Sequence, residues 1–195
     1  MPPSLLMIAQ TGNTPYRLRG ANALALALRG NDSLHSLSLA GCGFGAAAVD
    51  VLARALSDNR ALRHVLFDAS DPLDVHELNG ANSAATVDLG GKGIGMASLA
   101  FVAYFLGTVN DVATALVLAD NATKADGADA VARMIVRNKK LTALDLSDNR
   151  LGEHGAVAVA AALKKNRTIC RINMTGNSVR CPLPAHAPVL PRNVC

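Results

Sequence analysis

The stretch Leu141-Thr-Ala-Leu144-Asp-Leu146-Ser-Asp-Asn149 is the clearest copy of a pattern that recurs along this chain of 195 residues. Leucines occupy its first, fourth and sixth places, and an asparagine stands three residues after the last leucine. The stretches that begin at Leu34 and at Ile169 have the same form, with Cys42 in the asparagine place of the first. A pattern that returns along a chain indicates one structural unit stacked many times.

The spacing of the pattern is nearly constant. Its middle apolar residue falls at Ile8, Leu37, Val65, Val87, Leu116, Leu144 and Ile172. These positions are 28 or 29 residues apart, except for a step of 22 residues from Val65 to Val87. Between them, segments such as 20–31 and 155–166 carry alanine, valine and leucine at helical spacing. Each unit is therefore predicted to be a short strand, a turn and a helix of about three turns.

The leucine pattern with its Asn or Cys place resembles the leucine-rich repeat, and the long unit with a full helix resembles the ribonuclease-inhibitor-like subclass. The resemblance covers residues from about 4 to 180. It implies an α/β solenoid of about seven repeats, with a curved parallel sheet on the concave side and helices on the convex side. It indicates the fold far more specifically than the function, because this fold serves many functions.

Two segments depart from the repeat. The short step contains Pro72 and Gly80 and leaves room for only a turn or a stub of helix, so the third repeat is predicted to be truncated. Residues 181–195 hold four of the eight prolines of the chain and cannot continue the repeat. We therefore expect a leucine-rich-repeat domain over residues 1–180 and a Pro-rich C-terminal tail over residues 181–195, which either caps the last repeat or contacts a neighbour.

The composition fits one elongated domain with an aliphatic core. Hydrophobic residues make up 50% of the chain and aromatic residues only 3%. No apolar run is long enough to span a bilayer, and the first residues lack the basic flank of a signal peptide. The four cysteines indicate no disulfide framework, so we expect a reducing, cytoplasmic location.

Positive charge gathers where the predicted helices end. The net charge is +4, and the cations concerned are Lys139, Lys140, Lys164, Lys165 and Arg167. One interpretation is local, because cations at a helix C-terminus interact favourably with the helix dipole. The other is that stacking of the units brings these residues onto one basic rim, suited to an acidic protein tail or to a nucleic acid.

The predicted helix over residues 96–106 carries no charge and holds three of the six aromatic residues of the chain, Phe101, Tyr104 and Phe105. A helix that is apolar on every side is usually buried. The aromatic side chains are therefore expected either to fill the space left by the truncated repeat or to form an apolar convex contact with a partner.

Alternation along each strand predicts which side chains face the concave side. The candidates for concave-face binding are Ser38, Leu66, Asp68, Asp88, Val117, Asp145, Arg171 and Asn173. Because this set is small and mixed and holds no Trp or Tyr, the aromatic helix and the basic rim are equal candidates for the binding surface.

Other patterns have simpler explanations. The glycine-rich segment 89–95 precedes a helix but lacks Ser or Thr after Lys92, so its glycines belong to a strand-to-helix turn rather than to a phosphate-binding loop. Cys170, Cys181, His186 and Cys195 lie near the C-terminus, but they include no Cys-x-x-Cys pair. The histidines have no partner at catalytic spacing. We expect no cofactor, no metal and no enzymatic activity.

The sequence favours a non-catalytic protein–protein interaction scaffold that is a structural subunit of a larger assembly. By resemblance, such repeats occur in cytoskeletal and axonemal subunits, so association with the cytoskeleton or the flagellum is expected. Two alternatives stay open: a regulator of a small GTPase, resembling repeat-built GTPase-activating proteins, and a subunit of an RNA-containing particle that binds through the basic rim. Protein partners are expected, with nucleic acid less favoured and with neither a membrane nor a small-molecule substrate.

Overall fold

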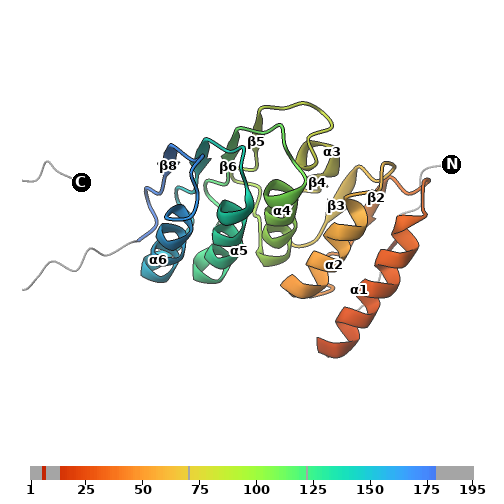
Figure 1. Cartoon of the computed structure of the whole chain (residues 1–195). Helices are drawn as coiled ribbons and strands as arrows, with labels where there is room; N and C mark the ends of the chain where they lie inside the picture. The colour runs from red at the N-terminus through yellow and green to blue at the C-terminus, as the bar shows by residue number, and fades with distance from the viewer. Residues whose placement is uncertain (1–5, 8–13, 70, 122, 179–195) are drawn as a thin grey trace, which may run out of the picture.

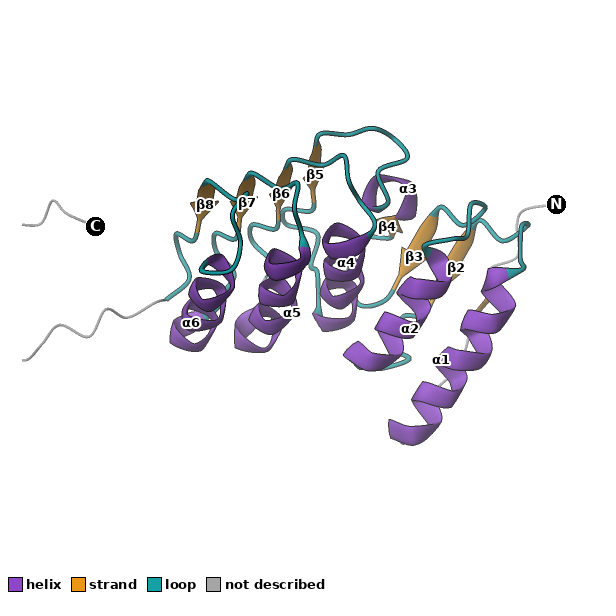
Figure 2. Cartoon of the chain, viewed as in Figure 1, coloured by secondary structure: helices purple, strands orange, loops and turns teal. Residues whose placement is uncertain are grey.

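The computed structural model describes residues 6–7, 14–69, 71–121 and 123–178. Its helices are α1 (Thr14–Arg29), α2 (Ala46–Leu56), α3 (Val75–Leu78), α4 (Met96–Thr108), α5 (Lys124–Arg137) and α6 (Gly152–Leu163). Its strands are β1 (Leu6–Met7), β2 (Ser36–Ser38), β3 (His64–Leu66), β4 (Leu73–Asp74), β5 (Thr86–Asp88), β6 (Ala115–Val117), β7 (Ala143–Asp145) and β8 (Arg171–Asn173). The long helices stand side by side in a row, and the strands line the other side of that row (Figure 1, Figure 2). The predicted Pro-rich tail, residues 181–195, lies outside the described residues.

The apolar residues that define the repeat lie side by side on neighbouring parallel strands. Leu37 of β2 pairs with Val65 of β3. Along the strands from β5 to β8 the register partners are Val87, Leu116, Leu144 and Ile172. The first three of these four are buried, so the strands share one apolar spine. The predicted α/β solenoid, with parallel strands on one side and helices on the other, is confirmed.

The first strand differs from the predicted spacing. Leu6 of β1 pairs with Leu37, whereas the pattern predicted Ile8 for this place. Ile8 itself lies outside the described residues. Residues two apart in a strand face the same side, so the apolar pattern alone could not choose between Leu6 and Ile8.

The strands form two four-stranded sheets, β1–β2–β3–β4 and β5–β6–β7–β8, rather than one continuous parallel sheet. The division falls at the third repeat, whose predicted truncation is confirmed, because its helix α3 has four residues. Here the chain turns back, and Leu73 of β4 pairs antiparallel with Val65. Asp74 then starts α3, since its carboxylate accepts hydrogen bonds from the backbone N–H groups of His76 and Glu77.

Small residues let neighbouring helices approach each other. Gly155 of α6 is buried against α5, and a Cβ atom added to it would lie 3.2 Å from the Cβ of Ala128. The same added atom would lie 2.6 Å from the side chain of Leu151. A bare backbone at this point therefore sets how closely α5 and α6 pack.

Candidate interaction surfaces

The concave face is built from the strand side chains that point away from the buried leucines. Ser38 and Leu66 are neighbours across β2 and β3. Across the second sheet, one continuous row is formed by Asp88, Val117, Asp145 and Asn173. Arg171 starts β8, next to Ala143 of β7. These seven predicted concave-face residues therefore lie on the strands as the alternation predicted.

A shallow depression of about 240 Å³ lies over β6, β7 and β8. The small side chains that line it are those of Ala115 and Ala143. The polar side chains that line it are those of Asp145, Arg171 and Asn173. A depression of this size has room for one or two side chains of a partner protein.

Asp145 is held in one orientation on this face. Its carboxylate accepts hydrogen bonds from the backbone N–H of Ser147 at 2.9 Å and from Ser147 Oγ at 2.7 Å. Nδ2 of Asn173 donates to the other carboxylate oxygen at 3.2 Å. Partial burial by itself raises the pKa of Asp145, but the bonds from Ser147 and Asn173 outweigh it, so the pKa is lowered from its usual value of 3.8. The row thus presents a fixed negative charge beside the positive Arg171.

Asp68, the eighth predicted concave-face residue, is exposed, but its carboxylate is engaged in capping a helix. It follows β3, where the two sheets divide, and its carboxylate accepts hydrogen bonds from the N–H groups of Ala97 at 2.8 Å and Ser98 at 2.9 Å. Both N–H groups belong to the first turn of α4, whose N-cap residue Gly95 has no side chain to serve them. A Cβ atom added to Gly95 would lie 2.6 Å from the carboxylate. Asp68 therefore caps α4 from the preceding unit.

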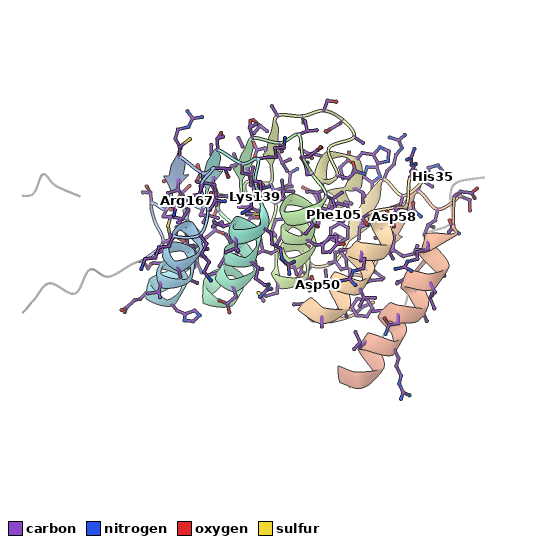
Figure 3. The ribbon with its side chains drawn as sticks, viewed as in Figure 1. His35, Asp50, Asp58, Phe105, Lys139 and Arg167 are labelled. Carbon is purple, nitrogen blue, oxygen red and sulfur yellow. The ribbon has the colours of Figure 1, made fainter. Side chains whose placement is uncertain are left out.

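Two of the three aromatic residues of α4 are internal. Phe101 and Phe105 are fully buried, with ring centroids 4.7 Å apart, and Phe67 lies 5.2 Å from Phe101. Figure 3 shows Phe105 among the packed helices. The predicted convex contact is therefore wrong for Phe101 and Phe105, because both side chains are fully buried and pack in a cluster with Phe67. Of the three, Tyr104 remains partly exposed.

The five residues of the predicted basic rim are all exposed: Lys139, Lys140, Lys164, Lys165 and Arg167. They lie on two loops of neighbouring units, 138–142 before β7 and 164–170 before β8; Figure 3 labels one residue on each, Lys139 and Arg167. Nδ2 of Asn166 ties the loops together, since it donates to the carbonyl oxygen of Asn138 at 3.1 Å. The stacking of the units thus brings the five cations onto adjacent loops.

The positive charge of the basic rim is not neutralised internally. Within the part of the chain that the structure describes, no Lys or Arg lies within 4.0 Å of a carboxylate, and the one basic–acidic contact in that range is between His154 and Asp129. Lys139 also supports the local interpretation, because its Nζ donates to the carbonyl oxygen of Val136 in the last turn of α5 at 3.0 Å. Asp111 occupies the place of Lys139 in the preceding unit, so the cationic loops end there.

A second set of ladder asparagines, which the leucine pattern did not reveal, holds these loops. Oδ1 of Asn138 accepts hydrogen bonds from the N–H groups of Lys140 and Leu141, and its Nδ2 donates to the carbonyl oxygen of Leu106 in the preceding unit. The same bonding pattern is made by Asn59, Asn110 and Asn166. The 28-residue spacing of Asn110, Asn138 and Asn166 was the signal in the sequence. These bonds present the basic rim on a fixed backbone.

The asparagines of the leucine pattern form a further ladder, at the strand-to-helix turns. Nδ2 of Asn149 donates to the carbonyl oxygens of Leu118 and Leu146, and its Oδ1 accepts from the N–H of Asn121. Asn177 repeats the arrangement one unit later. Cys42 holds the equivalent place, where burial raises the pKa of its thiol. This ladder is structural, because its side chains bond to backbone groups of the turns.

The described residues form neither a metal-binding cluster nor a membrane-spanning helix. Over residues 6–7, 14–69, 71–121 and 123–178, no group of three or more His, Cys, Asp or Glu side chains is placed to hold a metal ion. No helix in those ranges is long and apolar enough to cross a bilayer. Cys170 is exposed, and the rest of the C-terminal set, Cys181, His186 and Cys195, lies outside the described residues.

Comparison with known proteins bears on the fold. A family model described as Leucine Rich repeat matches residues 137–160, from the end of α5 into α6. Together with the stacked strand–loop–helix units and their aligned leucines, this match makes the chain a leucine-rich-repeat protein. The search of curated proteins found no match.

Two solved structures are similar to this chain. The structure of Leiomodin-1 Actin-Binding Site 2 is 24% identical over 52% of this chain and 64% of that chain, with a TM-score of 0.46. The tropomodulin C-terminal domain from Caenorhabditis elegans is 9% identical over 84% of this chain and 83% of that chain, with a TM-score of 0.40. The chain thus spans less than two thirds of the leiomodin-1 structure. At these values neither protein's binding activity transfers to this chain.

Proposed function

We propose that this chain is a non-catalytic protein–protein interaction scaffold that binds an acidic segment of a partner protein through the basic rim. The observation that carries the proposal is the rim itself, five exposed cations on two adjacent loops with no described carboxylate within ion-pair distance. Like charges held close together repel each other, so an anionic partner lowers the electrostatic energy of this surface.

An acidic protein segment suits the basic rim better than a nucleic acid. Single-stranded nucleic acids bind most strongly where aromatic side chains stack on the bases. The aromatic side chains that the structure describes belong to other segments, namely Phe44, Phe67, Phe101, Tyr104 and Phe105. A peptide bound to the basic rim can extend beyond it into the depression that Arg171 lines. The depression has room for one or two side chains of such a peptide. A subunit of an RNA-containing particle is the second candidate, since the same cations can contact phosphates.

The larger assembly that we propose is cytoskeletal or axonemal, in the cytoplasm or the flagellum. Support comes from the repeat of about 28 residues with a full helix, which favours the ribonuclease-inhibitor-like subclass found in such subunits. A small-GTPase regulator is the weaker proposal, because no feature of the described residues favours it.

Co-purification from cells that express the tagged chain tests the proposal. One variant replaces the five cations of the basic rim with alanine. A matched control replaces five exposed arginines elsewhere and changes the net charge equally: Arg19, Arg60, Arg63, Arg133 and Arg150. We expect a stoichiometric protein partner to stay with the wild type and the control and to be lost from the rim variant, with or without ribonuclease.

Three other outcomes of the co-purification would contradict parts of the proposal. A wild-type chain that stays a monodisperse monomer without a partner contradicts the scaffold. A partner that stays with the rim variant contradicts the use of the basic rim. A partner that ribonuclease releases favours the RNA-containing particle instead.

A further inference from the structure

A groove of about 350 Å³ runs between α1 and α2 on the convex face. It is lined by Asn22, Ala25, Leu26, Arg29, Val51 and Arg54. The groove lies at the α1 end of the row of helices, whereas the basic rim belongs to the units of α5 and α6 at the other end (Figure 1). The two surfaces are therefore separate.

The apolar part of the groove is unusual for this helix surface. Leu26 is 71% exposed and is the most exposed of the large hydrophobic residues that the structure describes. Leu26 stands at the same distance before the loop asparagine of its unit as Arg54 of α2 and Arg133 of α5 stand before theirs. The equivalent outer position is therefore an arginine in α2 and in α5. A single exposed leucine is ordinary, but Leu26 stands with Ala25 and the half-buried Val51 in one continuous lining.

The charged part of the groove is positive. Arg29 lies in the last turn of α1 and Arg54 in the last turn of α2, so both guanidinium groups belong to the same end of the groove. No acidic residue is among the lining residues, and neither arginine has a described carboxylate within 4.0 Å. The groove thus combines an apolar floor with an unneutralised cationic end.

We propose that this groove binds an amphipathic helix of a partner protein, whose apolar side chains cover Leu26 and Val51 and whose acidic side chains reach Arg29 and Arg54. The channel between two neighbouring helices accepts the side-chain ridge of a third helix. Asn22, Leu26 and Arg29 recur at the spacing of one helix face, so the contact extends over about two turns. Charge complementarity selects an acidic partner over a basic one.

Fluorescence anisotropy with a labelled synthetic peptide tests the proposal on the full chain. The probe is an amphipathic helix of about fifteen residues, with leucine at every third or fourth place and glutamate on the flanks. A matched peptide carries lysine in place of glutamate. Each titration is repeated in the variant whose basic rim is alanine, so that binding to the rim and binding to the groove are measured separately.

The variants address the groove alone. Leu26→Gln removes the apolar contact at an exposed site without changing the charge of the groove, so the fold is expected to persist. We expect this substitution to lower the affinity for the glutamate peptide by about ten-fold, both in the chain with the native basic rim and in the variant whose rim is alanine. Val157→Gln on α6, where the native residue is 63% exposed, is the matched control and leaves the affinity unchanged. The double change Arg29→Glu and Arg54→Glu reverses the preference towards the lysine peptide.

Three results would overturn the proposal. The first is equal binding of the glutamate and lysine peptides to the wild-type chain. The second is an affinity that Leu26→Gln does not change, or that Val157→Gln lowers as much. The third is dimerisation of the chain that Leu26→Gln abolishes, because the occupant of the groove is then a second copy.

Discussion

Asparagine side chains form hydrogen bonds with backbone N–H and carbonyl groups in the turns of this solenoid. The side chain of Asn138, for example, accepts hydrogen bonds from two N–H groups of its own loop and donates one to a carbonyl oxygen of the preceding unit. The leucine pattern identified Asn121, Asn149 and Asn177, because they belong to the repeated stretch. It did not identify the role of the loop asparagines or of Asp68, since their partners lie about 30 residues away and are known only once the units are stacked.

Asn138→Ala is expected to lower the free energy of unfolding by about 3 kcal/mol, since it leaves buried backbone groups without partners. Asn31→Ala is the control, because Oδ1 of Asn31 accepts from Ser33 and Leu34 in a more exposed loop, where water can replace it at a cost of about 1 kcal/mol. Urea unfolding monitored by circular dichroism gives both values. Equal losses in the two variants would contradict a special role for Asn138.

Asp145 is expected to titrate below its usual pKa of 3.8, and Ser147→Ala is expected to move the titration upwards by removing one hydroxyl donor. Because the pKa is lower in the folded chain than in the unfolded chain, the stabilisation from Asp145 is complete above the unfolded pKa. It is lost as the pH falls through the folded pKa. Carbon-13 NMR of the carboxyl group measures the midpoint, and a midpoint above 3.8 in the wild type would show that burial outweighs the hydrogen bonds.

At the scale of the element, α4 is the helix that the truncated repeat shapes most. The sequence predicted that it carries no charge and follows a short unit, and both features are present. The sequence could not decide whether Phe101 and Phe105 face a partner or the interior, because that depends on how α4 packs against the neighbouring units. The antiparallel strand β4 was equally hidden, since Leu73 and Asp74 are too few residues to show an alternating pattern.

Phe101→Ala is expected to cost about 4 kcal/mol of stability, because it opens a cavity between Phe67 and Phe105. Tyr104→Ala is expected to cost about 1 kcal/mol, since Tyr104 is partly exposed and meets Phe105 only edge-on. Chemical unfolding of the two variants gives the difference. A Tyr104 variant that is as unstable as the Phe101 variant would contradict the assignment of inside and outside on α4.

Asp68→Ala is expected to lower stability by about 1 kcal/mol, as the loss of a helix cap does. Hydrogen exchange should quicken at the amides of Ala97 and Ser98, which donate to the Asp68 carboxylate. The exposed Asp71 in the same connection is the control, and Asp71→Ala is expected to leave both amides unchanged. Unchanged exchange in the Asp68 variant would mean that other groups cap α4.

At the scale of the whole molecule, near-identical units repeat each surface position along the stack. The register of the leucines was predictable, because one apolar residue per unit returns at a nearly constant spacing. The division into two sheets was not, since it depends on how the chain turns back after β3. Stacking also explains why cations that are 28 residues apart, such as Lys139 and Arg167, come to lie on adjacent loops.

Titration of a glutamate-rich peptide into the full chain, over a series of salt concentrations, tests the central claim most directly. The peptide is designed without helical leucines, so that only the basic rim is measured. The wild type and the five-arginine control are predicted to bind it with affinities that fall steeply as salt rises, and the rim variant to bind about ten-fold more weakly at low salt. A rim variant that binds the peptide as tightly as the wild type at low salt would contradict the account.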